Sequence, residues 1–279
     1  MYQIICPIDF SPASENALDY AIEFGKNYSA QIVLLNVFSI PVASADAFVF
    51  VPGVDEINQI KNAWQERLDQ LILKYESKLN VGMGISGVVR YGEATMEILL
   101  LARDLKPNLV ILGMQGEGFI KEKIIGSTAT RVMAEYEKPI LIVPAGCRYH
   151  EAKNIVFFYD GQDFNDEHVL SPLVETVESL KSNLAVCTIV PNVEEFPDFQ
   201  EKLCSSTLAP SLSALSNVSY QIVQSPHFLD AIAHFLSEHP ADLIFTVKRK
   251  HNFLESLFKT SRAKTLAFHS DIPLLSSLD

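Results

Sequence analysis

Short apolar runs alternate with segments in which apolar residues recur every three or four positions. The run at residues 2–9 predicts a buried strand, and the next segment predicts a helix that Ser11 caps and Pro12 begins. The apolar face of this helix would consist of Ala17, Leu18, Ala21 and Ile22. Further strands are expected at 31–38, 85–92, 108–113 and 139–144, and helices at about 55–79, 93–105 and 127–136. Strands alternating with helices predict a mainly parallel sheet covered on both faces.

The helix expected at about 55–79 would place one apolar stripe against this sheet. Its stripe comprises Ile57, Ile60, Trp64, Leu68, Leu71 and Ile72. A tryptophan in such a stripe more often packs in the core than stacks on a ligand. We therefore expect Trp64 to be a packing residue.

The pattern restarts in the second half of the chain. The apolar run that ends at Asp160 parallels the first run, which ends at Asp9, and residues 108–143 align with 242–277 without a gap. This alignment matches Ser127 with Ser261, Ala129 with Ala263 and Pro139 with Pro273. A repeat of this length predicts two copies of one α/β domain, with bounds of 1–146 and 150–279.

Composition narrows the classes of partner. Hydrophobic residues make up 48% of the chain and charged residues 20%, which is typical of a globular protein. The net charge is −12, and both halves are acidic, so duplex nucleic acid and anionic membrane surfaces are poor partners. The uncharged run at 27–45 is broken by polar residues and Pro41, so no membrane span is expected there. Since Lys26 is the first basic residue and the four cysteines show no metal-ligand spacing, we expect a cytoplasmic protein with reduced thiols and no metal cluster.

A glycine-rich segment follows the strand at 108–113. Three glycines leave the strand end, and a Gly-Ser-Thr sequence opens the next helix; these residues are Gly113, Gly116, Gly118, Gly126, Ser127 and Thr128. Backbone N–H groups of such a loop and of a helix N-terminus bind phosphate, and the two hydroxyls can donate to it or face Mg²⁺ through water. A surface loop followed by an ordinary helix cap explains the same residues, and physical arguments alone do not separate the two interpretations.

Asp9 ends the first strand. In a doubly wound sheet of order 3-2-1-4-5, strands one and four are neighbours at the switch point, so Asp9 would lie beside the glycine loop. There its carboxylate can accept hydrogen bonds from ribose hydroxyls. A turn residue at the start of the next helix is the alternative role.

Together these segments resemble the universal stress protein family, as a tandem of two domains. The spacing Gly113-x2-Gly116-x9-Gly126-Ser127 reproduces the ATP-binding signature of one branch of that family, and the segments CPIDFSPASENAL and KPILIVP resemble its first and last strands. The resemblance implies two tandem α/β domains of the adenine nucleotide alpha hydrolase-like fold. It also implies that the first domain binds ATP, with or without Mg²⁺.

Site residues follow from the resemblance by position. Pro7 and Asp9 match positions that approach the ribose and adenine, and the backbone of Val37 matches the position that meets the adenine edge. The phosphate-holding positions match Gly113, Gly116, Gly126, Ser127 and Thr128. In the second half the three glycines are replaced by Val247, Lys250 and Thr260, so we expect a degenerate copy that does not bind ATP in this way. No catalytic residues are expected.

Three functions remain open on the sequence. The first is a regulatory stress-response module that binds an adenine nucleotide, the second a slow ATP hydrolase that uses the same pocket, and the third a scaffold that binds no nucleotide. The resemblance also implies an intramolecular pseudo-dimer in which the final strands, 140–144 and 274–278, associate edge to edge. Whether two chains also form a homodimer is left open.

Overall fold

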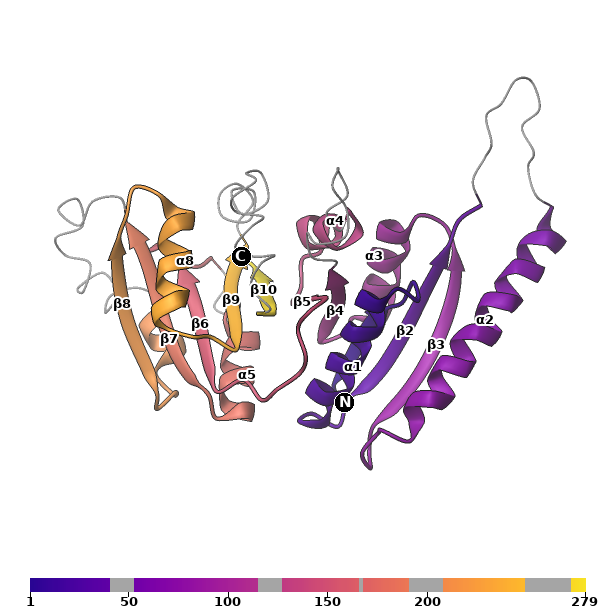
Figure 1. Ribbon diagram of the computed structural model, residues 1–279, viewed down its shortest axis with the longest axis horizontal. Coiled ribbons are helices and arrows are strands. Elements are labelled where there is room, and N and C mark those ends of the chain that lie inside the picture. Colours follow the sequence, from indigo (N-terminus) through magenta and orange to yellow (C-terminus); the bar gives the residue numbers. More distant parts are fainter. Residues whose placement is uncertain (41–52, 115–126, 166–167, 191–207, 249–271) are drawn as a thin grey trace, which may run out of the picture. The chain divides into compact units, whose positions relative to one another are not determined.

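The computed structural model describes residues 1–40, 53–114, 127–165, 168–190, 208–248 and 272–279. This part of the chain forms two compact units (Figure 1). The first contains the described residues up to Met114 and those from 127 to Tyr136, and the second contains those from Glu137 onward. The domain bounds expected from the sequence stay predictions.

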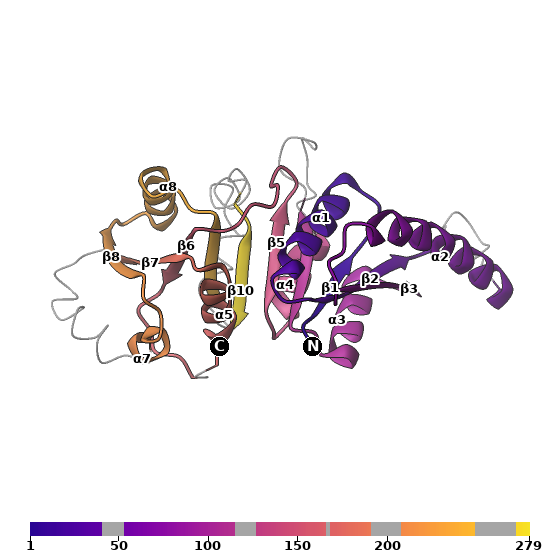
Figure 2. The same cartoon turned by 90° about the horizontal axis from the view of Figure 1, so that it is seen from below.

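A parallel sheet of order β3-β2-β1-β4 forms the centre of the first unit. Helices α1 and α2 cover one face of this sheet and α3 the other (Figure 2), and α4 packs on α3. The elements are β1 (Gln3–Pro7), α1 (Pro12–Lys26), β2 (Gln31–Phe38), α2 (Val54–Glu76), β3 (Gly84–Tyr91), α3 (Ala94–Leu105), β4 (Leu109–Met114) and α4 (Ser127–Glu135).

The second unit repeats this arrangement with strands in the order β8-β7-β6-β9-β10. Counted from β6, the first strand of this parallel set, the order is 3-2-1-4-5. The elements are β5 (Ile140–Pro144), β6 (Asn154–Tyr159), α5 (Ser171–Leu180), β7 (Asn183–Val190), α7 (Leu208–Leu212), β8 (Val218–Gln224), α8 (Phe228–Glu238), β9 (Leu243–Lys248) and β10 (Leu274–Leu278). All the pairs from β6 to β10 are parallel, whereas β5 pairs with β10 in the antiparallel direction.

These sheets confirm the predicted fold class, a doubly wound α/β architecture with mainly parallel strands. The alignment of 108–143 with 242–277 also matches the strand bounds. It carries β4 onto β9 and β5 onto β10 residue for residue. The strands paired in β5·β10 are the two whose association the sequence predicted, and the pseudo-twofold relation of whole domains stays a prediction.

Helix packing agrees with the apolar pattern in α1 but only partly in α2. The four residues expected to face the core from α1 are all buried. In α2 only Leu68 and Leu71 of the expected stripe are buried, together with Tyr75, and none of residues 54–63 is. An α-helix of this length spans about 34 Å, whereas an eight-residue strand spans about 26 Å. The amino-terminal half of α2 therefore extends past β3 (Figure 1), and the expected apolar face is buried only in the carboxyl-terminal half of the helix.

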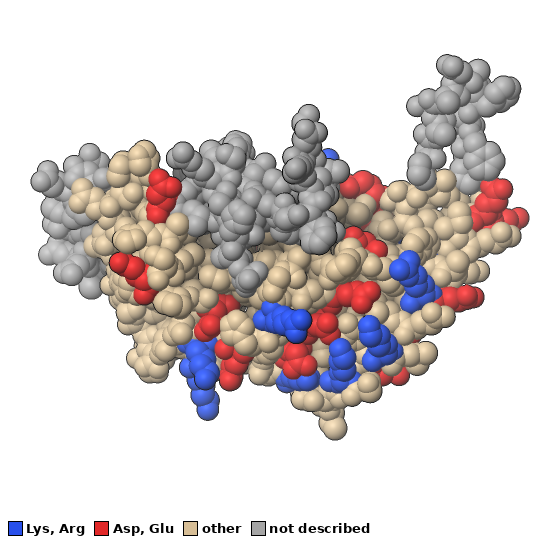
Figure 3. Space-filling view, in the orientation of Figure 1, with Lys and Arg blue, Asp and Glu red and all other residues tan. Residues whose placement is uncertain are grey.

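Acidic and basic side chains are interspersed on the described surface seen in Figure 3. Lys and Arg side chains do not gather on this face into an extended basic patch, which is the electrostatic feature that proteins use to bind duplex nucleic acid. In the described part of the chain, no helix has both the length and the apolar character required to cross a bilayer.

Candidate functional site

The turn between β1 and α1 is fixed by hydrogen bonds among its own polar residues. The Ser11 backbone N–H donates to Asp9 Oδ1 at 2.9 Å, and Ser11 Oγ caps α1 by accepting from the Ser14 backbone N–H at 3.2 Å. Between them Phe10 has a φ of 61°, in the left-handed region. The predicted cap is confirmed for Ser11, and Asp9 orders the turn that precedes it.

Asp9 carries a negative charge at neutral pH. Its partial burial raises the pKa of the carboxyl, but hydrogen bonds from Ser11 and Ser14 together lower it by more, so the pKa lies below its usual value of 3.8. An ionised carboxylate accepts hydrogen bonds and donates none. Asp9 is thus chemically suited to accept from two adjacent hydroxyls.

Val37 lies where β2 continues past the end of β1. The register pairs Pro7, the last residue of β1, with Leu35, and the Leu35 carbonyl accepts from the Ile8 N–H at 2.8 Å. Backbone groups of residues two apart in a strand point to the same side, so the backbone of Val37 also points toward the β1 side, beyond the last paired residue. A backbone edge beyond the last β1 pair is what the predicted contact with a base requires.

Asn36 holds the residue before Asp9 in place, a role that was not predicted from the sequence. Its side chain is buried, and Nδ2 donates to the Ile8 carbonyl at 2.7 Å, which holds the chain just after β1 against β2. The signal that could have revealed it is one amide in an otherwise apolar stretch of strand. A buried amide normally has a hydrogen-bond partner, and here that partner belongs to the residue before Asp9.

Gly113, near the end of β4, lies against the first turn of α1. A Cβ on this residue would come within 2.7 Å of the Ala13 carbonyl carbon and 3.0 Å of the Ser14 backbone nitrogen. Because the Ser14 N–H donates to Ser11 Oγ and the Ser11 N–H donates to Asp9, the structure brings Gly113 and Asp9 to the same turn. It also gives Gly113 a reason to lack a side chain that involves no phosphate.

The remaining predicted phosphate positions are described only in part. Ser127 is the first residue of α4, and Thr128 follows it with a half-buried side chain. The first N–H groups of a helix have no partner within the helix. Gly116 and Gly126 lie outside the described residues, as do Lys250 and Thr260 of the second half.

The second unit retains the turn geometry but not its surroundings. The Asp160 carboxylate accepts from the Gln162 N–H at 3.1 Å, and Gly161 between them has a φ of 78°, so Asp160 repeats the geometry of Asp9. However, α5 begins only at Ser171, and Val247 stands at the position that aligns with Gly113. In this longer connection between β6 and α5, the Asn165 N–H donates to the Asp279 carboxylate at 2.7 Å.

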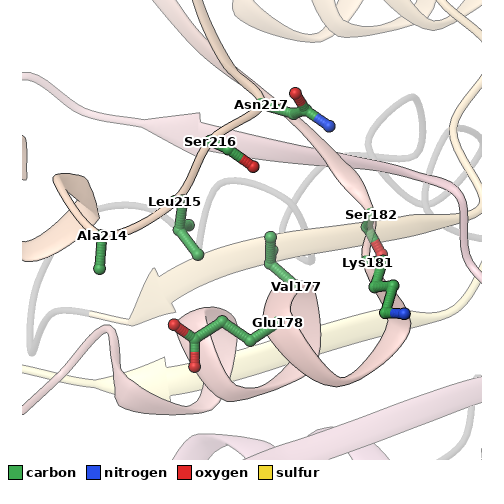
Figure 4. A pocket seen from close by; sticks show the side chains of 8 residues that line it. All are labelled: Val177, Glu178, Lys181, Ser182, Ala214, Leu215, Ser216 and Asn217. Atoms are coloured by element: carbon green, nitrogen blue, oxygen red, sulfur yellow. The ribbon is translucent and has the colours of Figure 1, made fainter.

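A cavity of about 190 Å³ also lies in the second unit, between the end of α5 and the start of β8 (Figure 4). Its lining is Val177, Glu178, Lys181, Ser182, Ala214, Leu215, Ser216 and Asn217. It is at the amino-terminal ends of β7 and β8, whereas ligands of open α/β sheets bind at the carboxyl ends of the strands. None of the predicted site residues lines it.

Comparison with known proteins decides the family. The family model described as "Universal stress protein family" matches residues 1–144. The chain belongs to the universal stress protein family. This confirms the resemblance seen in the glycine spacing and in the first and last strands of the first half.

Relatives of this universal stress protein match half of its length. It is 27% identical to universal stress protein MJ0577 of Methanocaldococcus jannaschii over 154 residues, 51% of this chain and 95% of that protein. It is 30% identical to universal stress protein YxiE of Bacillus subtilis over 147 residues, 50% of this chain and 97% of that protein.

A solved structure matches both halves. A universal stress protein from Archaeoglobus fulgidus superposes with a TM-score of 0.75 at 18% identity, covering 99% of this chain and 98% of that chain. At this identity the likeness concerns the fold. It shows that this universal stress protein shares its α/β architecture over nearly its whole length with another member of the family.

Proposed function

We propose that the first unit binds ATP at the carboxyl ends of β1, β2 and β4 and that the protein acts as a regulatory module of the stress response. The observation that carries the proposal is the convergence at Ser14. Its backbone N–H donates to Ser11 Oγ, the Ser11 N–H donates to the ionised Asp9, and a Cβ on Gly113 would lie 3.0 Å from the Ser14 nitrogen. A carboxylate for ribose hydroxyls and a side-chain-free strand end for phosphate thus meet at one switch point.

Each predicted site residue has a role in this proposal. Pro7 and Asp9 approach the ribose and the adenine, and the backbone of Val37 meets the base. The phosphates are held by backbone N–H groups of Gly113, Gly116 and Gly126 and by Ser127 and Thr128 at the start of α4. When bound, ATP or Mg-ATP would supply a charged ligand whose presence changes the relative stability of two conformations of the protein.

We also propose that the two domains form the pseudo-dimer expected from the sequence. The antiparallel pairing of Leu274 with Ile142 and of Ser276 with Ile140 supports it, because it joins the final strands of both copies. Covalent linkage of the copies raises the effective concentration of this contact.

The test is the nucleotide content of the purified protein. Protein prepared without added nucleotide is denatured, and released nucleotide is identified by chromatography and mass spectrometry, alongside a calorimetric titration with Mg-ATP. About one ATP per chain is the expected result. ADP that accumulates during incubation would favour the slow hydrolase, and no nucleotide in either experiment would favour the scaffold.

A matched pair of variants assigns the site to one unit. Asp9→Ala should weaken ATP binding, because it removes the acceptor for the ribose. Asp160→Ala removes a carboxylate of the same turn geometry from the second unit and should leave the affinity unchanged. Equal losses in both variants would contradict the assignment to the first unit.

A further inference from the structure

Phe10 keeps an aromatic side chain in a backbone conformation that favours glycine. Its φ of 61° is left-handed, and the second unit places Gly161, with a φ of 78°, at the equivalent step after Asp160. An L-residue in this region is less stable than glycine by about 1–2 kcal/mol. Strained residues persist where the surrounding contacts determine them, and they cluster at ligand sites.

The ring of Phe10 contacts two side chains of α2. Its ring stacks on Trp64 with centroids 5.7 Å apart and an interplanar angle of 19°. The Arg67 guanidinium carbon lies 4.0 Å from the Phe10 centroid and 5.3 Å from that of Trp64. Trp64, which was expected to be a packing residue, is half-buried and packs on Phe10 in this stack.

Arg67 is exposed, and its guanidinium is not part of an ion pair among the residues that the structure describes. The guanidinium carbon lies over the Phe10 ring, so the ring occupies one side of this planar group. A guanidinium held in this way stacks on a flat ligand with its other face, as arginine does on nucleobases.

Strand order indicates which part of a nucleotide Arg67 would meet. Helix α2 packs on β2 and β3, and the order is β3-β2-β1-β4. The stack is therefore on the β2 side of Asp9, where Val37 presents its backbone. The predicted phosphate positions follow β4, on the opposite side of β1.

We propose that the Arg67 guanidinium, held by Phe10 and Trp64, is the stacking surface for the purine base of the bound nucleotide. This inference rests on the proposed nucleotide site and adds a residue that recognises the base. Arginine is required for its plane as well as its charge, so lysine is not an equivalent side chain at this position.

The test is calorimetric titration of wild type, Arg67→Met and Arg67→Lys with ATP, AMP and adenosine. Both variants should lose about tenfold in affinity for all three ligands, because stacking on a base contributes about 1–3 kcal/mol and 1.4 kcal/mol is tenfold. Arg103→Met is the matched control: it removes an exposed arginine from α3, on the other face of the sheet, and should bind as wild type does.

Every other result of these titrations overturns a specific part of the inference. Normal binding by Arg67→Lys would show that charge alone matters, and a loss for ATP but not for adenosine would place Arg67 at the phosphates. Unchanged binding by Arg67→Met would remove Arg67 from the site while the proposed function stands. If wild type binds none of the ligands, the proposed function itself fails.

Phe10→Gly provides a second variant that keeps the backbone geometry. It copies Gly161, so a thermal unfolding midpoint close to that of wild type is expected. It should lose the same factor of about ten in affinity as Arg67→Met, and the double variant should lose no more than either one, because the residues act as one unit. Additive losses would contradict the proposed stacking.

The fluorescence of Trp64, which is the sole tryptophan of the chain, should be quenched by adenosine and not by inorganic tripolyphosphate.

Discussion

Gly113 on β4 and Ala13 in the first turn of α1 approach each other so closely that a side chain on Gly113 would overlap the Ala13 carbonyl group. The obstacle is helix backbone, which cannot rotate away as a side chain can. A residue assigned to phosphate binding from its spacing is therefore also a packing residue between a strand and a helix.

Gly113→Ala should lower the free energy of unfolding by about 1–3 kcal/mol, as is typical of overpacking. Gly84→Ala is the control, because a Cβ there meets only the flexible end of the Gln31 side chain. Urea denaturation of both variants measures the difference. Equal stability of the two variants would mean that α1 moves away from β4 at little cost.

Asp9→Asn should make stability less dependent on pH. The folded-state pKa of Asp9 is lowered, so its stabilising contribution is present above the unfolded value near 3.8 and is lost as the pH falls through the folded pKa. Denaturation midpoints of wild type and variant should differ at neutral pH and converge in acid. A constant difference across this range would show that the charge of Asp9 contributes nothing to the turn.

Ser11→Ala should destabilise the first unit by about 1 kcal/mol, because α1 loses the side chain that caps it. Ser77→Ala, which removes an exposed hydroxyl after α2, should be close to neutral. Thermal or urea unfolding of the two variants provides the comparison. A neutral Ser11→Ala would indicate that Asp9 alone holds the turn.

Two buried thiols should resist alkylation in the native protein. Burial raises the pKa of Cys6 and of Cys187 to about 12, so the reactive thiolate is scarce near neutral pH. Brief treatment with iodoacetamide, followed by mass spectrometry of the peptides, should show both residues unmodified. In denaturant both should react, and native-state modification of Cys6 would show that β1 opens.

Local patterns were sufficient to predict most of the fold. The period of the apolar residues located α1, and the short apolar runs located β5 and β10, because these signals lie within a few adjacent residues. The apolar stripe of α2 did not reveal which of its turns are buried. Which turns of a helix are covered depends on the length of the neighbouring strands. The identity of Ile60 does not indicate whether a strand reaches it.

The candidate site was predictable in its residues but not in its contacts. Glycine spacing and a strand-ending aspartate pointed to Gly113 and Asp9. The left-handed backbone of Phe10 and its stacking on Arg67 could not be predicted, because they depend on α2 reaching a turn more than fifty positions earlier in the chain. Phenylalanine, moreover, is not a residue that normally signals this conformation.

The coincidence of β4 with β9 and of β5 with β10 has a practical consequence. Residues 109–144 can be transplanted in place of 243–278 to give a chimeric chain of unchanged length, in which both strands keep their register. Such a chimera would carry the glycine signature twice. Its affinity for nucleotide would show how much binding the signature confers by itself. The remaining affinity of the first unit would then come from the shorter turn before α1 and from Arg67 of α2.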